Sequence, residues 1–286
     1  MASVVIPARN AASTIDDQLA ALVRQDHARP WEVIVADNGS SDDTASKAET
    51  WNGPLDLRVI DAGGPLGYSH PRNVGVAAAR GDVILFCDAD DIVVPGWVRS
   101  MVDALERFDI VAGPLDRITL NQPKQYQWMP DVHLPQTELP RAYSHLPFVP
   151  GGNMGIRRDV FESLGGFDIS LKGGEDIDLS WRAIRRGFAL GFAPDGVIHY
   201  RLREAAVSVA RRRYDGGKSE PLLYRLHAHD GMARDAPRDM WLVYAKLACE
   251  FPAALRSSYS RWAWAYRAGG RAGRLVGSVK SRTLFL

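Results

Sequence analysis

Short apolar runs of strand length alternate with helical segments along the first half of this chain. The runs that predict strands are residues 3–6, 32–36, 55–60 and 83–86. An alternation of this kind predicts an α/β fold, with a mostly parallel central sheet and helices on both of its faces. Ligands of such sheets bind beyond the carboxyl ends of the strands, so the turns at those ends are the first place to search for a site.

Polar turns follow three of these runs. They comprise residues 7–10, 37–44 and 88–91. Because the carboxyl ends of parallel strands meet at one edge of a sheet, we expect the three turns to line one crevice.

The turn at 88–91 carries carboxylates on Asp88, Asp90 and Asp91, directly after a buried strand. Like charges this close raise one another's pKa unless a cation or solvent separates them. Asp88 and Asp90 are two residues apart, so in an extended strand they share a face and can hold one hard cation. The alternative is a solvated strand-to-helix turn, since aspartate is common in turns. The position of the turn in the expected crevice favours the cation site.

Composition bounds the class of protein. The chain has 286 residues, enough for one large domain or for one domain with an extension. Its formal net charge of +1 argues against a general nucleic-acid binder. The two cysteines provide no disulfide framework and suit a reducing compartment. The first expected strand begins at once, which leaves no room for a signal peptide, and no uncharged apolar run reaches the roughly 18 residues that span a bilayer. We therefore expect a cytoplasmic protein.

The second half of the chain is less regular. Further runs that predict strands are residues 109–113, 151–156, 188–193 and 197–200. Residues 121–150 are rich in proline and aromatic side chains and show no clear period, which predicts a long loop. Loops of this length in a compact domain usually serve as lids or are disordered.

A helix is expected to begin at Glu175, after a turn at 165–168. Its apolar side chains recur at i, i+4 and i+7 and form one buried stripe, made by Ile177, Trp181 and Ile184. Its first turn holds Glu175, Asp176 and Asp178. The helix macrodipole favours negative charge at this end, which is the ordinary explanation for acidic residues there.

The composition of the chain changes from about residue 202, where basic side chains become more frequent. The basic run at 211–213 is expected to be a solvated helix face. Residues 251–286 contain no acidic side chain, and their basic side chains alternate with aromatic ones. Basic and aromatic residues on helices suit an anionic membrane surface. The alternative, which we favour at this point, is a helical extension that packs on the rest of the protein or forms a homodimer.

Five motifs, in this order, resemble glycosyltransferase family two. They are Pro7-Ala8-Arg9-Asn10, the run Asp37-Asn38-Gly39-Ser40-Ser41-Asp42-Asp43-Thr44, Arg72-Asn73-Val74-Gly75, Asp88-Ala89-Asp90, and Gly165-Gly166-Phe167-Asp168 followed by Glu175-Asp176. Asn38 stands where the family has its second aspartate. The resemblance covers roughly residues 3–199, and it rests on the order of the motifs rather than on any one of them.

The resemblance implies a GT-A fold, the fold of transferases that use nucleotide-diphosphate sugars. It predicts a catalytic domain over residues 1–200, with a nucleotide-sugar-binding half at 1–113 and an acceptor-binding half at 114–200. A helical C-terminal extension at 201–286 would follow this domain.

On the donor side, the resemblance implies a divalent cation, Mn²⁺ or Mg²⁺, held by Asp90 with Asp88 near it. The first carboxylate of this motif commonly faces the ribose or the sugar, and the second faces the metal. Further donor-binding residues implied by the motifs are Pro7, Ala8 and Asn10 at the base and ribose, Asp37 at the base, Ala89 within the acidic motif, and Arg72 at the diphosphate or the acidic turn.

On the acceptor side, Asp176 is the expected general base. It would remove the proton of the acceptor hydroxyl as the oxygen attacks the anomeric carbon from the opposite face, which inverts the anomeric configuration. Glu175 is expected beside it, orienting the acceptor. His199 is either a core histidine or, as in several GT-A enzymes, a residue that completes the metal site.

Two other functions remain open at this point. A sugar nucleotidyltransferase would share the carboxylate metal site, but residues 7–12 lack the glycines of a phosphate-binding loop. A non-catalytic carbohydrate-binding protein on the same fold would have no physical reason to keep clustered, repelling carboxylates. The expected partners are a nucleotide-diphosphate sugar and a carbohydrate or lipid-linked acceptor, with no nucleic acid. The extension could add peripheral contact with the inner face of the membrane, or a homodimer contact.

Overall fold

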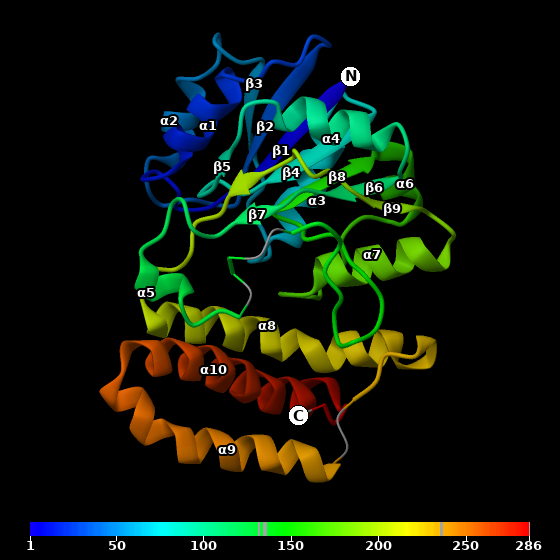
Figure 1. Ribbon diagram of the computed structural model, residues 1–286. Helices are drawn as coiled ribbons and strands as arrows, with labels where there is room; N and C mark the ends of the chain where they lie inside the picture. The colour runs from blue at the N-terminus through cyan, green and yellow to red at the C-terminus, as the bar shows by residue number, and fades with distance from the viewer. Residues whose placement is uncertain (131, 134–135, 235–236, 286) are drawn as a thin grey trace.

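The computed structural model describes residues 1–130, 132–133, 136–234 and 237–285. Its main sheet contains β1 Ala2–Ala8, β2 Trp31–Asp37, β3 Leu57–Asp61, β4 Val83–Cys87, β6 Ile110–Ala112, β8 Asn153–Arg157 and β9 Leu190–Phe192. The strand order is β3-β2-β1-β4-β8-β6-β9 (Figure 1). Neighbouring strands run parallel except at β8, which is antiparallel to both β4 and β6. The predicted α/β fold with a mostly parallel sheet is therefore confirmed.

A second, three-stranded sheet follows the acidic turn. Its strands are β5 Ile92–Val93, β7 Leu115–Asp116 and β10 Ile198–His199, with β10 in the middle. β10 pairs antiparallel with β5, which places His199 opposite Ile92. This pairing brings the residues that follow β10 back to the acidic turn, about a hundred residues earlier in the chain.

Helices cover both faces of the main sheet. Before the C-terminal extension they are α1 Ile15–Val23, α2 Thr44–Glu49, α3 Ser69–Ala78, α4 Trp97–Leu105, α5 Pro123–Tyr126, α6 Arg158–Ser163 and α7 Glu175–Arg185. Alternate side chains of β1 enter different cores, as the two-residue period of a strand requires. Val4 packs in the core that includes α1 and α4, whereas Val5 packs in the core that includes α3, α6 and α7. A strand buried on both faces explains the uninterrupted apolar run at the start of the chain.

Gly75 allows α3 to lie directly on the sheet. A Cβ atom at this position would lie 2.3 Å from Cγ1 of Val5, far inside van der Waals contact. Helix and strand can approach this closely only because the residue has no side chain. The glycine of the Arg72-Asn73-Val74-Gly75 motif therefore has a packing role, which keeps α3 and its Arg72 close to the carboxyl end of β1.

The expectation of an irregular loop over 121–150 is wrong in part. Residues 123–126 form α5, which begins with a capping box between Gln122 and Gln125. Nε1 of Trp128 then donates to the carbonyl of Gln125 at 2.7 Å, and the buried Trp128 ring packs against Tyr266. A single helical turn is too short to show a period, so the sequence pattern could not reveal it. Positions 131, 134 and 135 of the expected loop lie outside the described residues.

Three long helices form the extension after the second sheet. They are α8 Ala206–His227, α9 Pro237–Arg256 and α10 Ser258–Ser281, with a short 3₁₀ turn at Ala228–Asp230. They lie in layers below the sheet, with α8 nearest to it, α10 next and α9 outermost (Figure 1). Among the described residues, no helix combines the length and the apolar character needed to cross a membrane.

Glycines bring α10 against α8. A Cβ atom at Gly269, Gly273 or Gly277 would lie 2.2–2.4 Å from a backbone carbonyl oxygen of α8. These glycines are four residues apart, so they form one stripe along α10. The stripe makes α8 and α10 a closely packed pair, and a third apolar cluster with Trp181 of α7 and Leu223 of α8 joins the pair to the sheet domain.

Candidate active site

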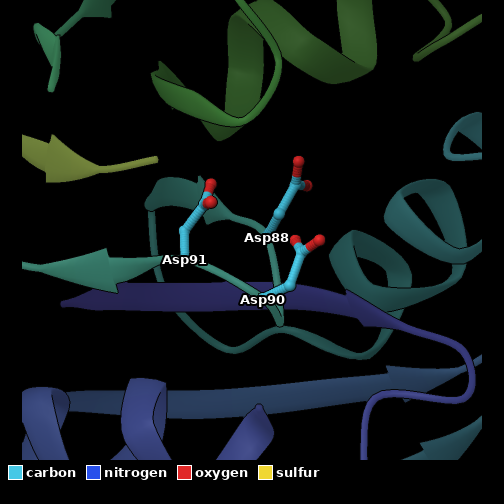
Figure 2. Close-up of side chains that lie close together, drawn as sticks. All are labelled: Asp88, Asp90 and Asp91. Carbon is cyan, nitrogen blue, oxygen red and sulfur yellow. The ribbon is translucent and has the colours of Figure 1, made fainter. Parts of the chain in front are cut away.

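Three carboxylates meet at the carboxyl end of β4. Ligand oxygens of Asp88, Asp90 and Asp91 all lie within 4.8 Å of one another. Figure 2 shows the three side chains rising on the same side of the turn, toward α7. Asp88 and Asp91 are buried, and Asp90 is half-buried. The turn is therefore not the solvated loop that remained possible from the sequence.

Burial makes this cluster unfavourable without a cation. Burial, followed by the charges of Asp88 and Asp90, raises the pKa of Asp91 to about 9. Burial and then the charge of Asp88 raise the pKa of Asp90 as well. Among the described residues, none donates a hydrogen bond to the buried Oδ2 of Asp91. An oxygen-only donor set with an unpartnered buried oxygen fits a hard divalent cation.

Arg72 joins this acidic turn to the start of α7. Its guanidinium lies 2.9 Å from Oδ1 of Asp88 and 3.2 Å from Oε1 of Glu175, and all three side chains are buried. The rings of Tyr68 and Phe167 flank the guanidinium carbon at 5.2 and 5.6 Å. A planar cation with five donors is suited to holding two carboxylates at once. The predicted contact between Arg72 and the acidic turn is present.

Glu175 and Asp176 differ in their surroundings. Burial, with the charge of Asp176 next, raises the pKa of Glu175 to about 7. Asp176 is half-buried, and its two oxygens accept hydrogen bonds from the backbone N–H groups of Gly151 and Ile177, at 3.0 and 2.9 Å. These bonds fix the orientation of the Asp176 carboxylate at the first turn of α7.

Two glycines before β8 leave room for the side chains of Arg72, Asp88 and Asp176. A Cβ atom at Gly151 would lie 2.6 Å from a guanidinium nitrogen of Arg72 and 3.4 Å from Cβ of Asp176. At Gly152 it would lie 2.9 Å from Oδ2 of Asp88. The sequence shows this Gly-Gly pair only as the start of a strand, and its place in the site comes from the fold.

The predicted base-binding residues form a second group, at the ends of β1 and β2. Ala8 is paired with Asp37 in the sheet, and the Asp37 carboxylate accepts hydrogen bonds from the N–H of Ser40. Asn10 has a positive φ of 51°, and its side-chain oxygen accepts from the N–H of Ser41 at 2.8 Å. Pro7 lies in β1 beside them, and Ala89 is buried within the acidic turn. β4 pairs with the other edge of β1, so the two groups end neighbouring strands.

His199 lies near the acidic turn but outside its carboxylate cluster. Its Nδ1 is 2.8 Å from Oδ2 of Asp116, on the neighbouring strand β7. Of the His, Cys, Asp and Glu residues that the structure describes, only the three aspartates form a group compact enough for one metal ion. The role of His199 stays a prediction.

Arginines for which the sequence predicts no role also lie beside the acidic turn. The backbone N–H of Arg201 donates to Oδ1 of Asp91 at 2.8 Å, and its Nε donates to the Asp90 carbonyl at 2.8 Å. Arg203 lies 3.8 Å from Oδ2 of Asp90.

The first part of α8 supplies a further arginine. Arg212 donates to the hydroxyl of Tyr68, and its guanidinium carbon lies 5.2 Å from the centre of that ring. Arg213 instead pairs with Glu220 at 3.1 Å. Arg211 and Arg212 are exposed, as expected of a solvated helix face, whereas Arg213 is half-buried, so the expectation is wrong for Arg213. The contact of Arg212 with Tyr68 joins residues 144 positions apart in the sequence, which a local charge pattern does not reveal.

Comparisons with known proteins agree with this geometry. Residues 3–165 match the family model described as glycosyl transferase family 2. The pre-mycofactocin glycosyltransferase of Mycobacterium tuberculosis is 29% identical over 230 residues, which cover 78% of this chain and 47% of that protein. The chain thus spans about half the length of that relative.

Two solved structures share the fold. Mannosyltransferase PcManGT from Pyrobaculum calidifontis, in complex with GDP-Man and Mn²⁺, has a TM-score of 0.64 at 20% identity, covering 98% of this chain and 86% of that one. TarS 1–349 of S. aureus, in complex with UDP-GlcNAc, has a TM-score of 0.56 at 16% identity, covering 99% of this chain and 92% of that one.

The mostly parallel sheet and its likeness to these structures define a GT-A fold, as predicted. The family model covers more than half of the chain, and the chain belongs to glycosyltransferase family 2. The acidic cluster is consistent with a divalent cation. The model match ends at residue 165, so Glu175, Asp176 and the whole extension lie beyond it.

Proposed function

We propose that this chain transfers a sugar from a nucleotide-diphosphate sugar to a hydroxyl group of a carbohydrate or lipid-linked acceptor, with inversion at the anomeric carbon. The proposal includes dependence on a divalent cation, Mn²⁺ or Mg²⁺. The observation that carries it is the Arg72 bridge, which holds Asp88 and Glu175 in one buried network. In this proposal, Asp88 belongs to the leaving-group site and Glu175 adjoins the base, so the Arg72 bridge supports a single displacement between them.

The donor side of the proposal rests on the acidic turn and the arginines around it. Asp90 and Asp88 would hold the cation, which when bound neutralises charge on the departing diphosphate. His199 is proposed as a further ligand, because a ligating histidine usually contacts a carboxylate through its other ring nitrogen, as His199 contacts Asp116. Arg203, beside Asp90, would bind a phosphate oxygen. Pro7, Ala8, Asn10 and Asp37 are proposed to receive the base and ribose, and Ala89 to line the path between them and the cation.

The acceptor side of the proposal rests on a difference in exposure. Glu175 is only 6% exposed and is paired with Arg72, whereas Asp176 is half-buried and can be reached from solvent. A general base must reach the proton that it removes, so Asp176 is the better candidate. Glu175 would position Arg72 and the first turn of α7, and through them the acceptor.

We propose that the chain is also divided into a donor-binding half, an acceptor-binding half and an extension. The proposed donor residues other than His199 and Arg203 precede residue 113, and the base lies between 114 and 200, as the predicted halves require. Residues 201–286 would form the extension, and Arg212 is proposed to lie at the rim of the donor site, a placement that its contact with Tyr68 supports. Both cysteines are free, which supports a cytoplasmic location for the proposed reaction.

The test measures release of nucleoside diphosphate from a panel of nucleotide sugars, with Mn²⁺ and candidate acceptors, followed by NMR of the product. We expect an inverted anomeric configuration and no turnover in EDTA. Asp176→Asn should retain donor binding by thermal shift and lose about a hundredfold or more in turnover, since a positioned base contributes about that much.

Glu175→Gln is the matched variant, since it alters the neighbouring carboxylate. Near-normal turnover in Asp176→Asn with loss in Glu175→Gln would reverse the two roles. A product of retained configuration would contradict the single displacement. Donor binding without any transfer would favour the non-catalytic carbohydrate-binding alternative, whereas the family match speaks against a nucleotidyltransferase.

A further inference from the structure

The outermost helix of the extension exposes apolar side chains. α9 packs on α10 and lies on the side of it away from α8 and the sheet (Figure 1). Leu242, Phe251 and Leu255 of α9 are 45–64% exposed, and Leu275 and Val279 of α10 are 41% and 80% exposed. Large apolar side chains that gather on one pair of helices are a more informative feature than the same residues scattered singly.

A groove lies between the two helices on this surface. It has a volume of about 430 Å³ and is lined by apolar side chains that include Leu247 and Phe251 of α9 and Trp264 and Leu275 of α10. The outward face of α9 also carries small side chains, with Ala245, Ala253 and Cys249 all exposed. We call these exposed side chains and the groove the α9–α10 face.

The segment that forms α9, α10 and the residues after them is strongly basic. Residues 237–286 contain nine basic and two acidic residues, although the whole chain carries a net charge of only +1. One of the two acidic residues, Glu250, is paired with Arg267 at 2.7 Å. Lys246 and Arg256, on the outer face of α9, and Lys280 of α10 are exposed. At least three exposed basic side chains therefore lie on the two helices that carry the apolar surface.

We propose that the α9–α10 face docks on the surface of a bilayer that contains anionic lipids. Exposed apolar side chains would enter the headgroup boundary, and basic side chains at the edge would contact the lipid phosphates, as in interfacial amphipathic helices. Charge complementarity selects this occupant over a second copy of the chain, since two such faces would bring like charges together. The helices lie on the bilayer and do not cross it, and the inference is independent of the proposed transfer reaction.

Cys249 provides a direct probe of this face. It is exposed on α9, whereas Cys87 is fully buried, so a thiol-reactive, environment-sensitive dye labels Cys249 selectively in the folded full-length chain. We expect a blue shift and co-flotation with vesicles of phosphatidylcholine and phosphatidylglycerol, and neither with phosphatidylcholine alone. Added salt should reverse the binding, since headgroup attraction is screened.

Substitutions on the α9–α10 face separate the apolar contribution to vesicle binding from the contribution of the basic side chains. Leu255→Glu should weaken vesicle binding roughly tenfold or more, because a large apolar side chain would no longer enter the boundary. Lys246→Gln and Arg256→Gln should each weaken it by roughly fivefold, the attraction expected of one basic residue near an anionic surface. Ile169→Glu is the matched control, since Ile169 is 52% exposed on the catalytic part, and it should bind as the unaltered protein does.

Equal binding to both vesicle types, or binding by Leu255→Glu equal to that of the unaltered protein, would overturn the proposal. A dimer in light scattering that Leu255→Glu converts to a monomer would assign the face to a second copy and would overturn it too. Lys246→Gln keeps the test valid if Leu255→Glu misfolds, because this substitution removes only an exposed charge.

Discussion

The single residue that most constrains the site is Asp91. It is fully buried, and its pKa of about 9 lies far above the ordinary 3.8. The folded protein therefore holds this proton more tightly than the unfolded chain does. Because of this difference, the stability of the cation-free protein should fall as the pH rises from about 4 to about 9. Burial is the largest cause of this raised pKa, and the charges that raise it further are those of Asp88 and Asp90, the residues proposed to hold the cation.

Asp91→Asn should raise the melting temperature in EDTA, because an amide cannot ionise. The gain should be small near pH 5 and should reach a few degrees near pH 8, at about 2–4 °C for each kcal/mol in a chain of this size. Added Mn²⁺ should raise the melting temperature of the unaltered protein more than that of the variant. A ligand that binds the folded protein stabilises it, and the variant lacks one carboxylate of the acidic cluster. Differential scanning fluorimetry across pH measures both effects.

Asp195→Asn is the control for this substitution, since Asp195 is exposed. Equal melting temperatures for Asp91→Asn and the control at high pH would show that the buried carboxyl does not destabilise the cation-free protein.

At the scale of residues, the motifs of the sequence indicate side chains that meet in the structure, but they do not indicate all of the contacts around them. Asp88, Arg72 and Glu175 were each assigned from a motif, and the structure joins them in one network. The contacts of Arg201 with Asp91 and of Arg212 with Tyr68 span 110 and 144 residues. No local pattern encodes a contact of that range, because it depends on how β10 and α8 return to the start of the domain.

At the scale of elements, the packing of α3 on β1 is the sharpest constraint. Gly75→Ala would place a Cβ atom 2.3 Å from Cγ1 of Val5, so helix and strand must separate. We expect a loss of about 1–3 kcal/mol in the free energy of unfolding, the usual cost of overpacking a core. Turnover should fall as well, because α3 carries Arg72.

A double-mutant cycle with Val5→Ala measures this contact in urea unfolding. Val5→Ala removes the methyl group that the new Cβ atom would meet, so the double variant should be more stable than the sum of the two single losses predicts. Additive losses would show that Gly75 is needed for some reason other than its approach to Val5.

The elements that sequence reading found are those with enough length to show a pattern. β1, β2 and β4 appear as apolar runs, and the stripe of α7 repeats every three to four residues. α5 and the two-residue strands of the small sheet are too short for any period. The antiparallel direction of β8 depends on the path of the chain through 121–150, which the apolar pattern of β8 itself does not contain.

At the scale of the whole molecule, the extension packs directly on the helix that carries the proposed base. Nε2 of His227, near the end of α8, lies 2.9 Å from Oδ1 of Asp178 in the first turn of α7, and both side chains are buried. The same helix α7 begins with Glu175 and Asp176. The glycine stripe of α10 then fixes α8 from the other side. The position of α8 is thus set by contacts along its whole length, and with it the position of Arg212.

A substitution of Arg212 tests whether the position of α8 matters for the proposed reaction. It is held on Tyr68, whose ring also contacts Arg72, and its positive charge lies close enough to act on Asp88, Asp90 and Asp91. Arg212→Gln should lower kcat/KM for the donor by roughly tenfold to a hundredfold, the usual effect of losing a hydrogen bond to a charged group. Arg211→Gln is the matched control: both arginines are exposed, and the same charge is removed from the same turn of α8 without removing the contact between Arg212 and Tyr68. Steady-state kinetics at varied donor concentration, with melting temperatures for both variants, measure the effect. If the two variants lost activity equally, the net charge of α8 would matter, and the specific position of Arg212 over the site would not.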